Sequence, residues 1–195
     1  MKISTLAAGS LFVAVAMPAA AVETIYTAVL NGASEAPPND SPAYGTATVT
    51  IDLDNGTMRV QESFSDLVAG VSASHIHCCT EIPRMGVAGV ATPIPTFTGF
   101  PSGVMSGVYD HTFDMTLASS YNPAFVDDNG GTVDGAFGTL VAGLNSGTAY
   151  ANIHTSEYPG GEIRGFLAPI PEPETYAMLL AGLGIISMVA RRRRA

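Results

Sequence analysis

Apolar and polar residues alternate along three segments in the first third of the chain, 23–30, 46–53 and 57–64. A period of two is typical of a β-strand with one buried face, because successive side chains point to opposite sides of a sheet. Asp54-Asn55-Gly56 separates the second segment from the third, and an Asn-Gly pair favours a tight turn. The pattern therefore predicts a first strand followed by a β-hairpin.

Four later segments are also rich in β-branched and aromatic residues, and they span 71–77, 108–117, 148–155 and 161–168. This composition predicts strands, with the last two forming a second hairpin. Residues 78–106 lack alternation and are interrupted by prolines and glycines, which predicts a long ordered loop. Long loops in compact domains are often functional.

One segment has a different period. Apolar residues recur at helical spacing from Val133 to Leu144, Thr132 is a suitable N-cap and Gly147 a suitable stop, so a helix is predicted near 133–145. About seven strands and one helix, without the regular strand–helix alternation of a parallel sheet, predict an all-β fold. We expect an antiparallel Greek-key sandwich or barrel.

The N-terminal segment is typical of a secretory signal peptide. Lys2 supplies a positive start, residues 3–16 are apolar, and Ala19-Ala20-Ala21 offers a small-residue cleavage site. Residues 1–21 are therefore expected to direct export and then to be removed. The working domain is expected to span residues 22–170.

The C-terminal segment 171–195 resembles a PEP-CTERM sorting tail, because a Pro-Glu-Pro motif, an apolar stretch and a basic run follow in order. The resemblance implies a bacterial cell-envelope or extracellular-matrix protein that an exosortase-type enzyme recognises, in a host that makes exopolysaccharide. The residues expected to act in sorting are Pro171, Glu172, Pro173, Arg191, Arg192, Arg193 and Arg194.

The apolar stretch at 175–190 is also a candidate transmembrane helix. It is shorter than the roughly 20 residues that usually span a bilayer. The arginine run that follows is typical of a cytoplasmic flank, however. We expect transient anchoring in the inner membrane before processing.

The working domain is strongly acidic. Residues 22–170 contain fifteen acidic and three basic side chains, a net charge of −12. Such a surface repels nucleic acid and other polyanions, so no nucleic-acid partner is expected. It suits cations, or solubility outside the cell.

A second resemblance covers nearly all of this domain. "LNGASEAPPNDSPAYGTATV", "SHIH" and "AYANIHTSEYPGGEIRGFL" resemble, in order, the CHRD domain that is repeated in chordin. The resemblance implies an exported β domain but brings no established activity. The first hypothesis is a binding or structural module, with exopolysaccharide or envelope proteins as candidate partners. The chain departs from the family pattern at Cys78-Cys79-Thr80.

Three histidines form a candidate metal site. His75 and His77 are two residues apart on a predicted strand and therefore share a face. If Ile76 and Ile153 are buried, His154 points away from the core together with this pair. Three imidazoles with an open fourth position suit zinc or copper, and His111 is a candidate fourth ligand. The alternative is a solvated or hydrogen-bonded strand face with no metal.

Cys78 and Cys79 are the only cysteines in the chain. Export to an oxidising compartment favours a vicinal disulfide that stiffens the start of the long loop. Adjacent cysteines make a strained disulfide, however, because their Cα atoms are closer than in most disulfides. An intermolecular bridge, free thiols, thiolate ligands and a nucleophilic cysteine remain open.

Charged residues elsewhere are expected to be structural. Glu162 and Arg164 are predicted to share a strand face, with Glu35 as a partner of Arg164. Calcium binding by Asp127, Asp128 and Asp134 is a weaker hypothesis, because EF-hand spacing is absent. Phosphate-binding loops and nucleophile elbows are absent from the sequence, so an enzyme is less expected than a binding module.

Overall fold

The computed structural model describes residues 23–170 and, beyond them, residues 180, 182–183, 186 and 191. The predicted signal peptide at 1–21 and most of the sorting tail, including most of the candidate transmembrane helix, lie outside the described residues. Within the described part of the chain, no helix is long and apolar enough to cross a membrane.

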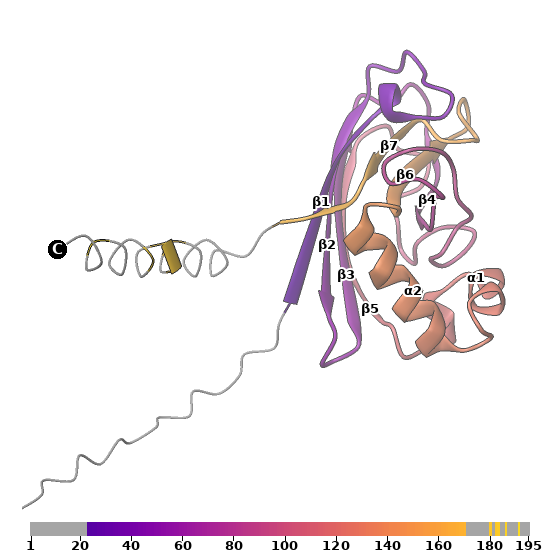
Figure 1. Ribbon diagram of the computed structural model, residues 1–195. Coiled ribbons are helices and arrows are strands. Elements are labelled where there is room, and N and C mark those ends of the chain that lie inside the picture. The colour runs from indigo at the N-terminus through magenta and orange to yellow at the C-terminus, as the bar shows by residue number, and fades with distance from the viewer. Residues whose placement is uncertain (1–22, 171–179, 181, 184–185, 187–190, 192–195) are drawn as a thin grey trace, which may run out of the picture.

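A single antiparallel sheet, curled into a half-barrel, makes up most of the domain (Figure 1). Its strands follow the order β4-β6-β7-β1-β2-β3-β5, and β8 pairs with β1. The bounds are β1 (Glu23–Asn31), β2 (Tyr44–Asp52), β3 (Thr57–Ser65), β4 (Val71–His77), β5 (Gly107–Asp114), β6 (Tyr150–Thr155), β7 (Ile163–Phe166) and β8 (Ala168–Pro169). The helices are α1 (Pro123–Asp128), α2 (Val133–Ser146) and the short 3-10 turns η1 (Gly32–Ser34) and η2 (Ala118–Ser120).

The predicted all-β class with one substantial helix is confirmed, and so are both hairpins, β2–β3 and β6–β7. The last hairpin is shorter than predicted. Thr148 donates its N–H to the carbonyl of Gly143 at the end of α2, so β6 begins only at Tyr150. Glu162 lies before β7 rather than in it. Helix α1 was not predicted, and Asn122 caps it by accepting from the N–H of Ala124.

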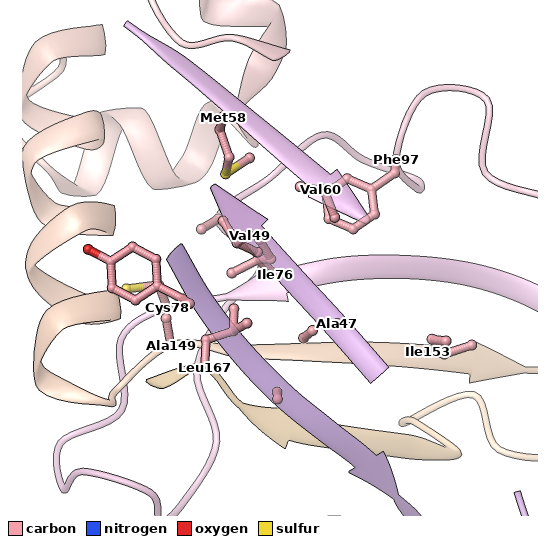
Figure 2. Packing of buried hydrophobic residues seen from close by; sticks show 14 of the residues in the cluster. Ala47, Val49, Met58, Val60, Ile76, Cys78, Phe97, Ala149, Ile153 and Leu167 are labelled. Carbon is pink, nitrogen blue, oxygen red and sulfur yellow. The ribbon is translucent and has the colours of Figure 1, made fainter. Parts of the chain in front are cut away.

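The buried core fills the inner face of the sheet. Figure 2 shows Val49, Met58 and Val60 packed with Ile76 of β4 and with Phe97 from the long loop. Leu140 and Leu144 of α2 belong to the same cluster. Burial of these apolar side chains is the main contribution to the stability of the domain.

Strand alternation places the histidines on the other face. Ile76 and Ile153 are fully buried in the core, so their neighbours along β4 and β6 point outward. In the register of these strands His75 lies opposite Asn152, and His154 lies opposite Ala73. The histidines are therefore gathered on one outer patch of the sheet.

The long loop at 78–106 covers the edge of β4. Phe97 donates its N–H to the carbonyl of Ser74, and Ala91 donates to that of Ile76, at 3.0 and 2.9 Å. Ile76 in turn donates to the hydroxyl of Thr92 at 2.9 Å. These bonds satisfy the backbone of an edge strand and hold the loop against the histidine patch.

Candidate metal centre

The structure brings His75, His77 and His154 together. One ring nitrogen from each histidine lies within 4.8 Å of the other two. The ring centroids are 5.2 to 5.8 Å apart. His75 and His77 are buried, whereas His154 is half-buried. Nitrogens that share one zinc ion can be at most about 4.2 Å apart, since zinc–nitrogen bonds are about 2.0–2.1 Å, so a small movement of the rings would bring all three onto one ion.

Each imidazole is oriented by a backbone carbonyl from a loop. His75 Nε2 bonds to the carbonyl of Pro95 at 2.7 Å, His77 Nδ1 to that of Ala88 at 2.9 Å, and His154 Nδ1 to that of Pro159 at 3.0 Å. A carbonyl oxygen only accepts, so each of these ring nitrogens must carry the proton. The opposite nitrogen of each neutral ring then has a free lone pair.

One nitrogen of each ring is left without a partner, in a cluster where each ring has a nitrogen within 4.8 Å of the other two. His75 Nδ1, His77 Nε2 and His154 Nε2 are buried and have no hydrogen-bond partner among the described residues. A buried acceptor without a donor costs about 1–3 kcal/mol. Three such acceptors in one histidine cluster form a site that a cation would satisfy. A carbonyl partner on the opposite nitrogen is the usual second contact of a metal-binding histidine.

The electrostatics favour neutral imidazoles. Burial lowers the pKa of His75 to about 4 and that of His77 to about 4. Burial also lowers the pKa of His154. Since a metal binds the deprotonated nitrogen, protons do not compete for these rings at neutral pH.

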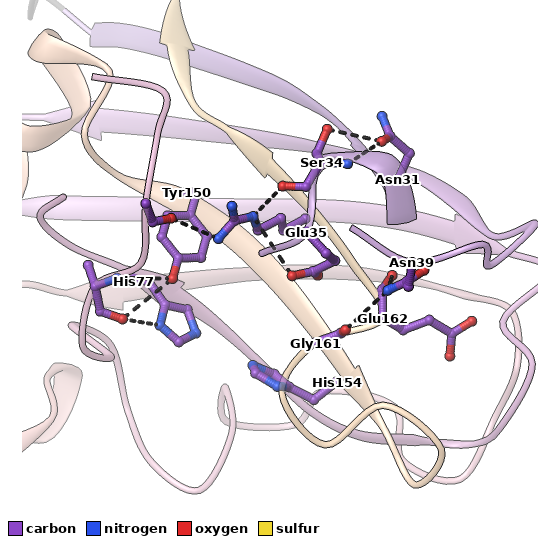
Figure 3. A network of polar contacts seen from close by, with 12 residues as sticks. Asn31, Ser34, Glu35, Asn39, His77, Tyr150, His154, Gly161 and Glu162 are labelled. Atoms are coloured by element: carbon purple, nitrogen blue, oxygen red, sulfur yellow. Dashed lines mark hydrogen bonds and ion pairs between the residues drawn. The ribbon is translucent and has the colours of Figure 1, made fainter. Parts of the chain in front are cut away.

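An aromatic side chain of β6 and a positively charged side chain of β7 support the site. The ring of Tyr150 is stacked on that of His77, with centroids 4.8 Å apart and planes 3° from parallel. Figure 3 shows the ring of Tyr150 beside that of His77. The Arg164 guanidinium lies 4.8 Å from the centre of the Tyr150 ring. The layered packing fixes the orientation of His77.

Arg164 and Glu35 form a buried ion pair beside this stack. Arg164 Nε is 3.8 Å from Glu35 Oε2, and both side chains are only 5% exposed. Arg164 also donates to the carbonyls of Ser34 and Gly86. Burial raises the pKa of Glu35 to about 7, although Arg164 acts to lower it.

Glu162 does not join this pair. Its carboxylate accepts from Ser41 Oγ at 2.6 Å, Thr155 Oγ1 at 2.7 Å and the N–H of Val68 at 2.8 Å. Because β7 begins at Ile163, strand alternation does not hold Glu162 on the face of Arg164. Figure 3 shows its carboxylate directed away from Glu35. Glu162 instead ties three separate segments of the chain together.

The other candidate ligands, one histidine and three aspartates, lie away from the histidine cluster. His111 is in β5, at the opposite edge of the sheet from β4, and its ring packs against Phe113. Asp127, Asp128 and Asp134 are exposed on α1 and α2. Among the described residues, the three histidines are the one group of three or more ligating side chains within reach of a common ion.

The carbonyls that orient the rings were not predicted. Ala88, Pro95 and Pro159 contribute backbone oxygens, which leave no mark in a pattern of side chains. Tyr150 was more accessible to prediction, because it lies four residues before His154 in the same strand and therefore shares its face.

The fold and the site together define an antiparallel half-barrel with a histidine cluster on its outer face. Residues 26–167 match the family model of the CHRD domain, and the chain belongs to this family. Residues 169–194 match the PEP-CTERM protein-sorting motif. Comparison with curated proteins and with solved structures gives no match. The sorting motif marks an exported protein that exosortase-type machinery recognises and that reaches the cell envelope or the exterior.

Proposed function

We propose that this exported domain binds one copper or zinc ion through His75, His77 and His154. The observation that carries the proposal is the close approach of three imidazoles, each of which has a buried ring nitrogen without a partner among the described residues. Histidines with a purely structural role would be expected to use both ring nitrogens, or to leave the second one in water.

The donor set favours copper or zinc over harder ions. All three ligands are neutral imidazole nitrogens, which suit zinc and copper, whereas magnesium and calcium prefer oxygen. Three protein ligands leave a fourth position for water or another small molecule, unlike a closed structural zinc site. The proposed site therefore allows a reactive metal as well as a bound one. Exopolysaccharide and envelope proteins stay predicted partners of the domain.

Metal content tests the proposal directly. The purified full-length protein, offered zinc and then copper and desalted, is expected to retain about one ion per chain by elemental analysis. The double variant His75→Ala/His77→Ala is expected to lose more than about 100-fold in affinity, since loss of an outer-shell partner alone costs 10–100-fold. His111→Ala is the matched control and is expected to keep the ion, because His111 lies at the opposite edge of the sheet. A metal-free wild type, or a double variant that binds normally, would contradict the proposal.

A separate experiment concerns the tail. We infer that the Arg191–Arg194 run anchors the C-terminus at the cytoplasmic side before processing. Deleting the run is expected to shift the protein from the envelope fraction to the medium or to degradation, as judged by fractionation and immunoblotting. Unchanged fractionation would remove this role, and substitution by four lysines is expected to preserve it.

A further inference from the structure

Cys78 and Cys79 directly follow the ligand His77 at the end of β4. Their Sγ atoms lie at bonding distance. Cys78 is buried in the core, whereas Cys79 is exposed. Both line a pocket of about 320 Å³, together with Phe125, Thr139 and other residues of α1, α2 and the long loop. One of the two sulfurs is therefore open to a small molecule.

We propose that Cys78 and Cys79 form a reversible disulfide, that small thiols reduce it from this pocket, and that its reduction weakens metal binding at the histidine cluster. The last part rests on the proposed metal site. The first two parts stand on the cysteines and their pocket alone.

The reaction is a two-step thiol–disulfide exchange. The thiolate of a small thiol attacks Cys79 Sγ, the bond between the two cysteine sulfurs breaks, and Cys78 leaves as a thiolate that takes up a proton. A second thiolate attacks the small-thiol sulfur of the mixed disulfide, so the oxidised small disulfide is released and Cys79 leaves as a thiolate. Cys79 is then protonated, so two external thiols are oxidised and the two cysteines are reduced.

The pocket can hold the reduced form. The carbonyl of Thr139 lies 3.7 Å from Cys79 Sγ and 4.0 Å from Cys78 Sγ. A disulfide has no proton to donate, whereas two thiols have, so this carbonyl can accept a hydrogen bond from the sulfurs only after reduction. Gly143 of α2 leaves the room that both sulfurs occupy, because an added Cβ would overlap them.

The cysteines are linked to the metal site by two backbone contacts. Cys78 donates its N–H to the carbonyl of Gly89 at 3.0 Å. The neighbouring carbonyl, that of Ala88, orients His77. The bond to Cys79 restricts the direction in which the chain leaves β4, and thus helps to hold the loop that returns at Ala88. Without this bond the loop is freer, and the carbonyl orients the ring less well.

The pocket also has a preference among thiols. Asp128 lines it, and the chain carries a net charge of −9. An anionic thiol is repelled by this field, whereas a cationic thiol is attracted. We therefore expect cysteamine to reduce the protein faster than mercaptoethanesulfonate at equal thiolate concentration. Asp128→Asn is expected to narrow the difference in rate.

The experiment has two independent parts on the full-length protein. Thiol titration in denaturant is expected to find no free thiol before treatment and two after reduction and anaerobic desalting. Zinc affinity is then measured for both forms, and the reduced form is expected to bind about tenfold more weakly, as for loss of an outer-shell contact. The double variant Cys78→Ala/Cys79→Ala is expected to bind like the reduced form.

The outcomes separate the two proposals. Free thiols before treatment, or a disulfide that cysteamine does not reduce, would overturn the exchange site. Equal zinc affinity in both forms would overturn the coupling, and so would tighter binding after reduction, since thiolates would then be ligands. Reversible thiols in a protein that binds no metal in either form would leave the exchange site standing while the metal site fails.

Discussion

Replacing Arg164 with alanine is expected to lower the free energy of unfolding by about 3–5 kcal/mol at pH 8. The variant leaves the Glu35 carboxyl buried without its cation, so the folded variant must keep a proton there that the unfolded chain releases, and breaking one side of a buried pair typically costs this much. It also removes donors to the carbonyls of Ser34 and Gly86 and the cation above the ring of Tyr150. Urea unfolding followed by circular dichroism measures the change.

Arg59→Ala is the matched control. Arg59 makes two hydrogen bonds to Asp110 with better geometry, at 2.8 and 2.5 Å, but both side chains are 49% exposed. Exposed pairs contribute about 0.2–1 kcal/mol, so burial rather than geometry decides the difference. Equal losses in the two variants would show that Arg164 is not effectively buried.

The loss in the Arg164 variant is also expected to depend on pH. The pKa of Glu35 is already raised to about 7 with Arg164 present, and removal of the cation raises it further. Near pH 6 the carboxyl is protonated in both folded proteins, so the missing cation matters less. Above pH 7 the wild type ionises Glu35 beside Arg164, whereas the variant does not, and the two stabilities diverge.

The histidine cluster could be predicted from the sequence because strand alternation is a strong constraint. Once Ile76 and Ile153 are assigned to the core, His75, His77 and His154 must share the outer face. Their actual distance depends on β4 pairing with β6, a contact between distant segments that alternation does not specify. The orientation of the rings depends on loop backbone, which single-sequence patterns do not describe.

For the charged residues, strand alternation was a poorer guide. Glu162 and Arg164 are two apart, so alternation predicted a shared face, but the strand begins between them and the prediction does not apply. Glu62, in contrast, shares the inner face with Val60 and Phe64. Alternation alone places this carboxyl in the core.

Replacing Glu62 with glutamine is expected to stabilise the protein relative to the wild type as the pH rises. Glu62 is 3% exposed, its Oε2 accepts from Ser74 Oγ at 3.0 Å, and its Oε1 has no partner among the described residues. Burial, the largest cause, raises its pKa to about 8. Glutamine has nearly the same shape and stays neutral, so it imitates the protonated acid.

The direction of this pH dependence follows from the number of protons that the folded and unfolded proteins bind. Below pH 4.5 Glu62 is protonated in the folded and the unfolded wild type, and the pH has no effect through this group. Between pH 4.5 and 8 the unfolded chain releases the proton while the folded protein keeps it, so the free energy of unfolding falls as the pH rises. The difference between Glu62→Gln and wild type should therefore grow by on the order of 3–4 kcal/mol over this range. Urea unfolding at several pH values measures it.

Comparing Glu62→Gln with the wild type separates the effect of Glu62 from that of the histidines. The histidines change the free energy of unfolding with pH in the opposite direction. His75 and His77 have lowered pKa values, so they make the folded protein less stable as the pH falls from 6.5 towards 4. This contribution is present in both proteins and cancels in their difference. Glu81→Gln, at an exposed position, is the control for the substitution itself. Parallel stability curves for Glu62→Gln and wild type would mean that the carboxyl ionises in the core with the help of water. Strand β4, which carries Ser74 and His75, would then be more open to solvent than the contact between Ser74 and Glu62 indicates.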